Sequence, residues 1–326
     1  MSGYRYTFKK FLKDWMLVIG MIAGAGIYLV YHAIPALHPA GPYLEFICRK
    51  IQPVLLFSML FLAFCKIEPS QLKPHRWQGW LLIIQGSLFI TLAVILALCR
   101  NIGHFIGLES LMLCLICPTA TACAVVTGKL GGDMAGVVGY TILINILVSI
   151  LVPTFIPLIH PMEGMTFAAA FSRIIAKVFP LLIMPCLLAW VVRYLFPIVH
   201  ARILKYTDAA FYIWAVALTL AILTSTRAIV QSDEGPAVLL DMAVASALAC
   251  IFQFWAGKRV GQRYGHTITA GQALGQKNTV FGIWMGYTFL DPVTSISCGF
   301  FSIWQNAFNT WQLYKTRKKR EKSGAA

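Results

Sequence analysis

Charged residues are scarce in this sequence, and acidic residues are the scarcest of them. Asp and Glu together number 12 among 326 residues, and all charged residues make up 12% of the chain. A soluble domain of this size usually carries about a quarter charged residues, spread over solvated faces between short apolar runs. That arrangement is missing, which excludes an ordinary soluble globular protein.

Motifs for nucleotide chemistry and for hydrolysis are also missing. The sequence contains no P-loop, HExxH or GxSxG. Its nine cysteines are scattered through apolar stretches, so they do not form a secreted disulfide framework. Cys114 and Cys117 make one CxxC without a second one or a histidine pair, and we interpret them as packing thiols. We therefore expect no enzyme activity, no cofactor and no metal.

Long apolar runs dominate the chain instead. Hydrophobic residues make up 59% of the sequence, and the mean hydropathy is +0.73. Runs of roughly 20 apolar residues, the length that spans a bilayer as a helix, recur from end to end. They predict an all-α membrane protein with ten transmembrane helices. These lie near residues 15–35, 46–65, 78–99, 105–128, 134–158, 167–195, 206–230, 236–257, 267–290 and 293–314.

The basic residues indicate how these spans are oriented. The net charge of +15 comes from Lys and Arg between the apolar runs and in the tail "KTRKKREK". This pattern is typical of membrane topology and does not require a nucleic-acid partner. The tail is interpreted as a topology anchor, with attraction to anionic lipid headgroups as the alternative. We expect a multi-pass protein of the bacterial inner membrane with both termini in the cytoplasm.

Ten spans divide into two halves of five. An odd number of spans in each half inverts the second half relative to the first, an architecture common among secondary transporters. The expected domains are a cytoplasmic N-terminus (1–14), a first five-helix repeat (15–160), a second, inverted five-helix repeat (161–314) and a basic cytoplasmic tail (315–326).

Two spans at matching positions of the halves are interrupted by Gly, Pro or small polar residues. The fourth carries "CPTATACAVVTGKLGGD" and the ninth carries "GQALGQKNTVFG". Paired broken helices are the best sequence indicator of a transporter's binding site, because irregular backbone at that depth must lie inside protein or beside a cavity. The alternative is that the small polar residues only pack helices together.

These segments resemble the bile acid:sodium symporter family. Residues 117–133 are similar to its fourth-helix signature. "LGQKNTVFG" (274–282) and "FFSIWQN" (300–306) are similar to its Glu-Val-Gly-Met-Gln-Asn and Phe-Ser-x-Trp-His-Asn motifs. "LLFSMLFLAFCKIEPSQLK" resembles its second helix and the loop after it. The resemblance implies a panel domain, a core domain with two broken helices that cross at its centre, and uptake of organic anions with sodium.

The sequence departs from the sodium-coupled pattern where the ion would bind. The resemblance places Cys123 and Ala124 at a Ser-Asn pair, Ala273 at a Glu and Lys277 at a Gln. Sodium prefers hard oxygen ligands, which thiol and methyl groups do not offer. The candidate substrate or ion site comprises Gln85, Thr119, Thr121, Cys123, Thr141, Gln276, Lys277, Asn278, Thr279 and Asn306.

Lys277 is expected near the middle of the bilayer. It lies about eleven residues beyond His266, and a helix rises by about 1.5 Å per residue. We interpret it as a tethered replacement for the bound cation, hydrogen-bonded to carbonyls, Thr hydroxyls or the Gln85 amide. This argues against sodium as the coupling ion and leaves a proton open, since burial disfavours a charged ammonium. The alternative is a lysine that snorkels to the cytoplasmic loop.

Other polar residues of the spans are interpreted structurally. Arg173 and Lys177 are expected to be interfacial anchors, with an entrance for an anion as the alternative. Asp241 is expected to pair with Arg227 at the outer end, with a proton carrier as the alternative. Asn145 and Asn306 are expected to form hydrogen bonds between helices, and Asn306 also belongs to the candidate site by resemblance.

The favoured function is a secondary transporter that moves a small organic solute, by resemblance an organic anion, by alternating access. Two alternatives stay open. One is a membrane-embedded redox or metal protein that uses Cys114, Cys117 and Cys123, and the other is a non-transporting membrane sensor.

Overall fold

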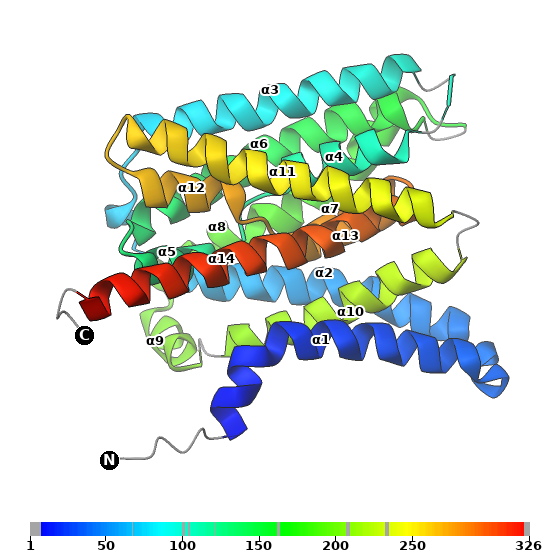
Figure 1. Ribbon diagram of the computed structural model, residues 1–326, viewed down its shortest axis with the longest axis horizontal. Helices are drawn as coiled ribbons and strands as arrows, with labels where there is room; N and C mark the ends of the chain where they lie inside the picture. Colours follow the sequence, from blue (N-terminus) through cyan, green and yellow to red (C-terminus); the bar gives the residue numbers. More distant parts are fainter. Residues whose placement is uncertain are drawn as a thin grey trace.

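The chain is all α-helical in a computed structural model that describes residues 8–66, 68–99, 102–103, 105–120, 122–161, 164–206, 209–231 and 235–322. Figure 1 shows most helices lying side by side along the long axis of the molecule. Helix α1 begins and α14 ends at the same end of this bundle. The prediction of an all-α protein is confirmed.

Fourteen α-helices and three short 3-10 turns make up the regular structure of the described residues. They are α1 (Phe8–Ala33), η1 (Pro35–Ala40), α2 (Gly41–Cys65), η2 (Pro69–Gln71), α3 (Arg76–Cys99), α4 (Ile106–Ile116), α5 (Cys123–Leu130), α6 (Met134–Ile159), α7 (Phe167–Leu182), α8 (Met184–Leu195), α9 (Pro197–Lys205), α10 (Ala209–Gln231), α11 (Pro236–Gln262), α12 (Thr267–Gly275), α13 (Thr279–Phe289), η3 (Pro292–Ser295) and α14 (Ile296–Lys322). Helix α14 continues into the expected tail, so the boundary at residue 315 does not end the helix.

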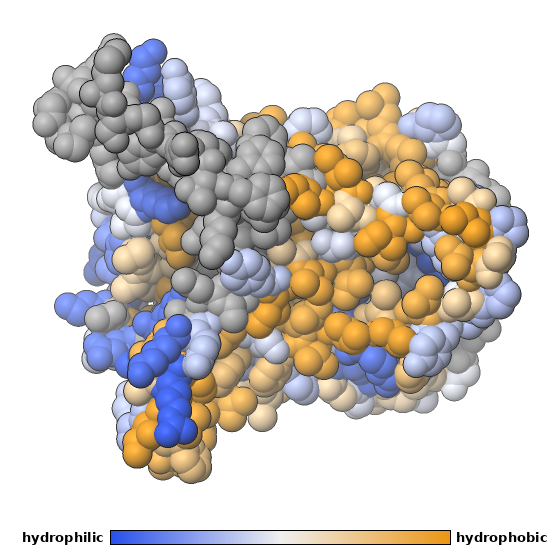
Figure 2. Space-filling view, turned by 90° about the horizontal axis from the view of Figure 1, so that it is seen from below, coloured by the Kyte–Doolittle hydropathy of each residue, from blue (hydrophilic) through white to orange (hydrophobic). Residues whose placement is uncertain are grey.

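The surface of this bundle suits lipid. Many large apolar side chains are exposed, among them Leu98, Ile251 and Leu240. Figure 2 shows apolar residues over the middle of one face and hydrophilic residues gathered mainly toward one end. A soluble monomer rarely exposes apolar surface on this scale, since water would make it aggregate.

Four segments of the described residues are long and apolar enough to cross a membrane, by length and composition alone. They are Pro35–Cys65, Arg76–Cys99, Met134–Ile159 and Pro236–Gln262, and the bent pair α7–α8 would make a fifth. This test finds fewer than the ten predicted spans, because several apolar runs are divided into shorter helices. Helix α4, for example, contributes only Ile106–Ile116 before the chain breaks.

Close packing of α12 on α11 positions the second of the interrupted segments. A Cβ at Gly257 of α11 would lie 2.5 Å from the Ala270 carbonyl oxygen of α12, and a Cβ at Gly261 would meet the His266 carbonyl. Small residues four apart let two helices approach backbone to backbone. The chain can therefore turn at residues 263–266 and return α12 along α11 into the interior.

Candidate functional site at the paired helix interruptions

The first interruption separates α4 from α5. Pro118 has no N–H to continue the helix, and it disfavours helical backbone in the residue before it. Cys117 accordingly leaves the helical region, with φ −47° and ψ 132°. The helix resumes at Cys123. Thr121, a predicted site residue, lies outside the described residues.

The second interruption separates α12 from α13. Gln276 is extended, with φ −95° and ψ 106°. The Asn278 side chain accepts a hydrogen bond from the Phe281 N–H at 3.2 Å, and this caps the first turn of α13. Lys277 stands at the centre of the break, between the C-terminus of one short helix and the N-terminus of the next.

The two interruptions cross and pair with each other. Thr119 and Lys277 lie opposite one another in an antiparallel β-bridge. Unpaired backbone groups are costly at this depth, and the bridge satisfies them mutually. Its two hydrogen bonds run from the Ala120 N–H to the Gln276 carbonyl at 2.9 Å and from the Asn278 N–H to the Pro118 carbonyl at 2.8 Å.

Gln85 of α3 secures the end of α4. Its Nε2 donates to the carbonyls of Ile116 at 3.2 Å and Cys117 at 3.1 Å. Its Oε1 accepts from the Tyr140 hydroxyl of α6 at 2.9 Å. Gln85 is buried, and the two carbonyls belong to the last residues before Pro118, which the helix itself leaves without donors. The predicted site residue therefore holds the first interruption in place.

Gln305 of α14 secures the second interruption in the same manner. Its Oε1 accepts from the Lys277 N–H at 2.8 Å, and its Nε2 donates to the Lys277 carbonyl at 3.2 Å. The predicted residue was Asn306, whose Nδ2 instead donates to the Ser302 carbonyl of its own helix at 2.7 Å. The signal that could have found Gln305 is its helical spacing from Ser302 and Asn309, which puts all three buried amide or hydroxyl groups on one face.

The Lys277 side chain is the most unusual feature of the crossing. It is only 1% exposed, and its Nζ has no hydrogen-bond partner among the described residues. The predicted bonds to carbonyls, to a Thr hydroxyl or to the Gln85 amide do not form among the described residues. The Gln85 oxygen accepts from the Tyr140 hydroxyl instead, and the described Thr hydroxyls of the candidate site have other partners. Thr119, for example, donates its hydroxyl to the Ala273 carbonyl at 2.8 Å. The thiols of Cys117, Cys123 and Cys114 lie near the Lys277 side chain.

A sequence comparison agrees with this geometry. The sequence model of the sodium bile acid symporter family matches residues 53–232, more than half of the chain. The chain belongs to this family. The predicted resemblance is confirmed, and the chain is an integral multi-pass membrane transporter and not an enzyme.

The family match reaches from α2 to the end of α10, so it includes the interruption between α4 and α5 but stops before α12. Members of the sodium bile acid symporter family bind solutes and cations within the bilayer. No curated protein matches the sequence. The match therefore does not include the second interruption, whose description comes from the structure alone.

The thiols at the crossing of this symporter-family chain are buried in the apolar core. Cys117 Sγ lies 3.8 Å from Cys298 Sγ, and Cys114 donates to the Ser297 hydroxyl at 3.6 Å. All nine cysteines are free. Within the part of the chain that the structure describes, no group of three or more His, Cys, Asp or Glu is arranged to hold a metal ion.

The remaining predicted residues are distributed unevenly around the crossing. The Thr279 hydroxyl donates to the Ser302 hydroxyl at 3.4 Å. The Thr141 hydroxyl donates to the carbonyl one turn back in its own helix, at 3.0 Å. Besides Lys277 Nζ, two more polar atoms of residues 276–278 have no protein partner among the described residues. They are Gln276 Oε1 and Asn278 Nδ2.

Two predicted contacts away from the crossing have different outcomes. Asn145 Nδ2 donates to the Leu182 carbonyl of α7 at 3.3 Å, which confirms the predicted bond between helices. The predicted pair of Asp241 with Arg227 is wrong, because Arg227 forms its ion pair with Glu45 of α2. The Asp241 carboxylate faces the backbone of α4 instead.

Proposed function

We propose that this chain is a secondary transporter that carries a small organic anion through the bacterial inner membrane by alternating access. Its family membership supports solute transport. The observation that carries the finer proposal is the crossing of the two interruptions around the buried side chain of Lys277. Crossed broken helices create a site where backbone groups and a few side chains can bind a solute or an ion.

The proposed arrangement has ten spans in two inverted halves, with α4–α5 and α12–α13 each forming one broken span. Helices α1, α2, α7–α8 and α10 form the panel, and α3–α6 and α11–α14 form the core. The packing of α1 on α10, of α2 on α8 and α10, and of α4 on α3, α11 and α14 supports this division, while α6 and α7 pack together across it. Both chain termini are cytoplasmic, in keeping with the basic tail.

Lys277 takes the place of a bound cation in this proposal. It directly follows the C-terminal end of α12, and the neighbouring thiols of Cys114 and Cys117 lie at the C-terminal end of α4. Helix C-termini carry partial negative charge, which favours a positive group beside the ends of α12 and α4, whereas the N-termini of α13 and α5 at the same crossing oppose it. A sodium ion would find no oxygen ligand in the side chains of Ala273 and Cys123.

A buried ammonium without a hydrogen-bond partner nevertheless costs several kcal/mol. Two events in a transport cycle would relieve this cost: binding of an anionic solute near Nζ, or loss of the proton from Lys277. Transport would then be independent of sodium, as a uniport or with a proton as the coupling ion.

Uptake into proteoliposomes tests this proposal. A thermal-shift screen of the purified protein against organic anions would first select a solute that raises the melting temperature Tm. We expect uptake of that solute to be the same with and without a sodium gradient. Lys277→Gln should abolish uptake, whereas the control Lys258→Gln, on α11, should retain it. Sodium-stimulated uptake by the wild type would show that the bound cation has not been replaced.

A further inference from the structure

Five basic side chains gather at the end of the molecule opposite the chain termini. Two of them lie over aromatic rings of α13: the Arg49 guanidinium is 5.2 Å from the centroid of Tyr287, and Lys177 Nζ is 5.6 Å from that of Phe289. These contacts place the basic residues where α2 and α7 meet α13. The outer cation cluster, as we name it, consists of Arg49, Lys50, Arg173, Lys177 and Arg227.

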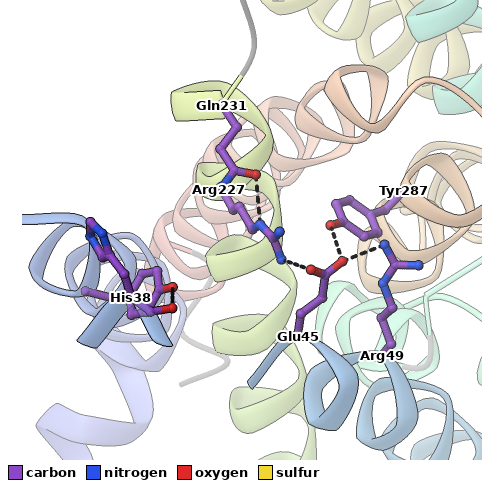
Figure 3. Close-up of polar contacts among 7 residues, drawn as sticks. His38, Glu45, Arg49, Arg227, Gln231 and Tyr287 are labelled. Atoms are coloured by element: carbon purple, nitrogen blue, oxygen red, sulfur yellow. Dashed lines mark hydrogen bonds and ion pairs between the residues drawn. The ribbon is translucent and has the colours of Figure 1, made fainter. Parts of the chain in front are cut away.

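One carboxylate, that of Glu45, is bonded to this cluster. Figure 3 shows Glu45 between Arg49 and Arg227, with the Tyr287 hydroxyl beside it. Arg49 donates to Glu45 Oε1 at 2.6 Å, Tyr287 donates to the same oxygen at 3.3 Å, and Arg227 pairs with Oε2. Glu45 therefore bonds to both arginines, but its single negative charge can balance only one of their two positive charges.

The other three cations of the cluster have no such partner. Within the described residues, Lys50, Arg173 and Lys177 form no ion pair. The charged groups that act on Lys177 are Arg173, Lys50 and Arg49, and all of them are positive. Like charges at this range repel, and the repulsion grows beside a low-dielectric bilayer. An anion bound among these cations would remove the repulsion.

The location of the cluster argues against a role in topology alone. Lys and Arg are disfavoured in the outer segments of membrane proteins, because positive residues are retained on the cytoplasmic side. The sequence predicted Arg173 and Lys177 to be anchors at the lipid interface. In the fold, Lys177 is directed to the Phe289 ring of α13, across the boundary between the two groups of helices. Arg49, Lys50, Arg173 and Lys177 are nonetheless exposed, so a solute can reach them.

We infer that the outer cation cluster is a binding site for an oxyanion carried on an apolar body, such as an organic carboxylate, sulfonate or phosphate ester. The cations would bind the oxyanion, and the partly exposed ring of Tyr287 would offer apolar surface beside it. Clustered positive charge also raises the local concentration of anions and speeds their capture. The role in solute entry rests on the proposed function, but binding itself does not.

Glu45 acts as the occupant of this site when no ligand is bound. Its carboxylate, bonded to Arg49 and Arg227, already lowers the positive charge that an incoming carboxylate would meet, so the two compete for the cluster. This assigns opposite effects to neighbouring substitutions: loss of a cation weakens binding of the anion, and loss of Glu45 strengthens it. A lipid anchor would not show this reversal.

The test is binding of dansylglycine, a fluorescent carboxylate with an apolar ring system, to purified protein in phosphatidylcholine nanodiscs. Its neutral amide is the matched control ligand. We expect the carboxylate to bind more tightly than the amide, and the double variant Arg173→Gln/Lys177→Gln to bind the carboxylate at least about fivefold more weakly. Glu45→Gln should bind it more tightly. Lys258→Gln should match the wild type.

A second arm identifies the source of the oxyanion. Nanodiscs that contain phosphatidylglycerol should leave dansylglycine binding intact if the site takes a dissolved solute, and should abolish it if the site holds a lipid headgroup. Equal binding of the carboxylate and the amide, or an unchanged affinity in both Arg173→Gln/Lys177→Gln and Glu45→Gln, would overturn the inference. Binding without uptake in proteoliposomes would count against the transport proposal alone.

Discussion

Thr119 and Lys277 lie opposite each other in a backbone bridge, one from each half of the chain. Because main-chain atoms of the neighbouring residues make its two hydrogen bonds, the bridge does not depend on either side chain. Substitution at Lys277 therefore leaves these bonds available. This property makes Lys277→Gln informative, since a loss of uptake would report on the ammonium and not on the crossing itself.

Gln85→Leu is expected to lower the free energy of unfolding by about 2 kcal/mol, because it leaves buried carbonyls and a hydroxyl without partners. The carbonyls are those of Ile116 and Cys117, and the hydroxyl is that of Tyr140. Tyr140→Phe is the matched control and should cost less, since both carbonyls keep their donor. The measurement is Tm in detergent, followed by tryptophan fluorescence. A Gln85→Leu protein as stable as Tyr140→Phe would show that the amide does not support α4.

Asn278→Ala is expected to destabilise the protein by about 1 kcal/mol, because it removes the side-chain oxygen that caps α13. Asn278→Ser keeps a capping oxygen and should recover most of the loss. The two variants are compared by Tm and, once a solute is known, by uptake. The cap has no role if Ala and Ser lower Tm equally.

Gly282→Ala is expected to cost about 1–3 kcal/mol, since an added methyl group would overpack a filled interior. Its Cβ would stand 2.5 Å from the sulfurs of both Cys117 and Cys298. Cys298→Ala removes one of these sulfurs, so the double variant should be more stable than the sum of the two single effects predicts. Gly79→Ala, which meets nothing within 4 Å, is the control and should not destabilise α3. Additive effects of Gly282→Ala and Cys298→Ala on stability would contradict the close contact between these two positions.

His160, just beyond the end of α6, should make the stability depend on pH. Burial opposes the charge of the ring, but the hydrogen bond to Glu109 Oε2, at 2.9 Å, and the charge of that carboxylate raise the pKa of His160 above its ordinary 6.5. The charged ring therefore stabilises the folded state fully below about pH 6.5, and this contribution fades as the pH rises through the raised pKa.

The measurement is Tm of the wild type and of His160→Gln from about pH 5.5 to 9. We expect the wild type to be the more stable protein at the acidic end, with the difference shrinking toward the alkaline end. The other histidines are present in both proteins, so the difference isolates His160. A difference that stays constant over this range would exclude the charged pair.

The positions of the helix interruptions could be predicted because local chemistry decides them. Pro118 and the small polar residues after it favour an end of α4, and the polar run at Gln276–Asn278 stands out against its apolar context. A proline alone does not decide the position, because Pro153 and Pro157 lie inside α6. The length-and-composition pattern likewise predicts helices throughout. Thr141, in contrast, was included by family resemblance, and its hydroxyl bonds within its own helix.

The residues that contact each other across helices could not be predicted with equal success. Asn306 and Gln305 differ by one position, but one residue rotates a side chain by about 100° around a helix. Only the docking of α14 decides which of them meets Lys277. Similarly, Asp241 was expected to pair with Arg227, but the neighbour of α10 turned out to be α2 with Glu45 and not α11 with Asp241. These choices depend on tertiary packing.

The backbone pairing of the two interruptions also sets an order for biosynthesis. When the ribosome has completed only the first half, the Pro118 carbonyl and the Ala120 N–H have no partner, because theirs come from Asn278 and Gln276. Such groups cost several kcal/mol each in hydrocarbon. Helices α4 and α5 must then remain hydrated, or shielded by the insertion machinery, while residues up to α13 are made. In the proposed ten-span arrangement, the fourth span would be completed only after α13 has been made.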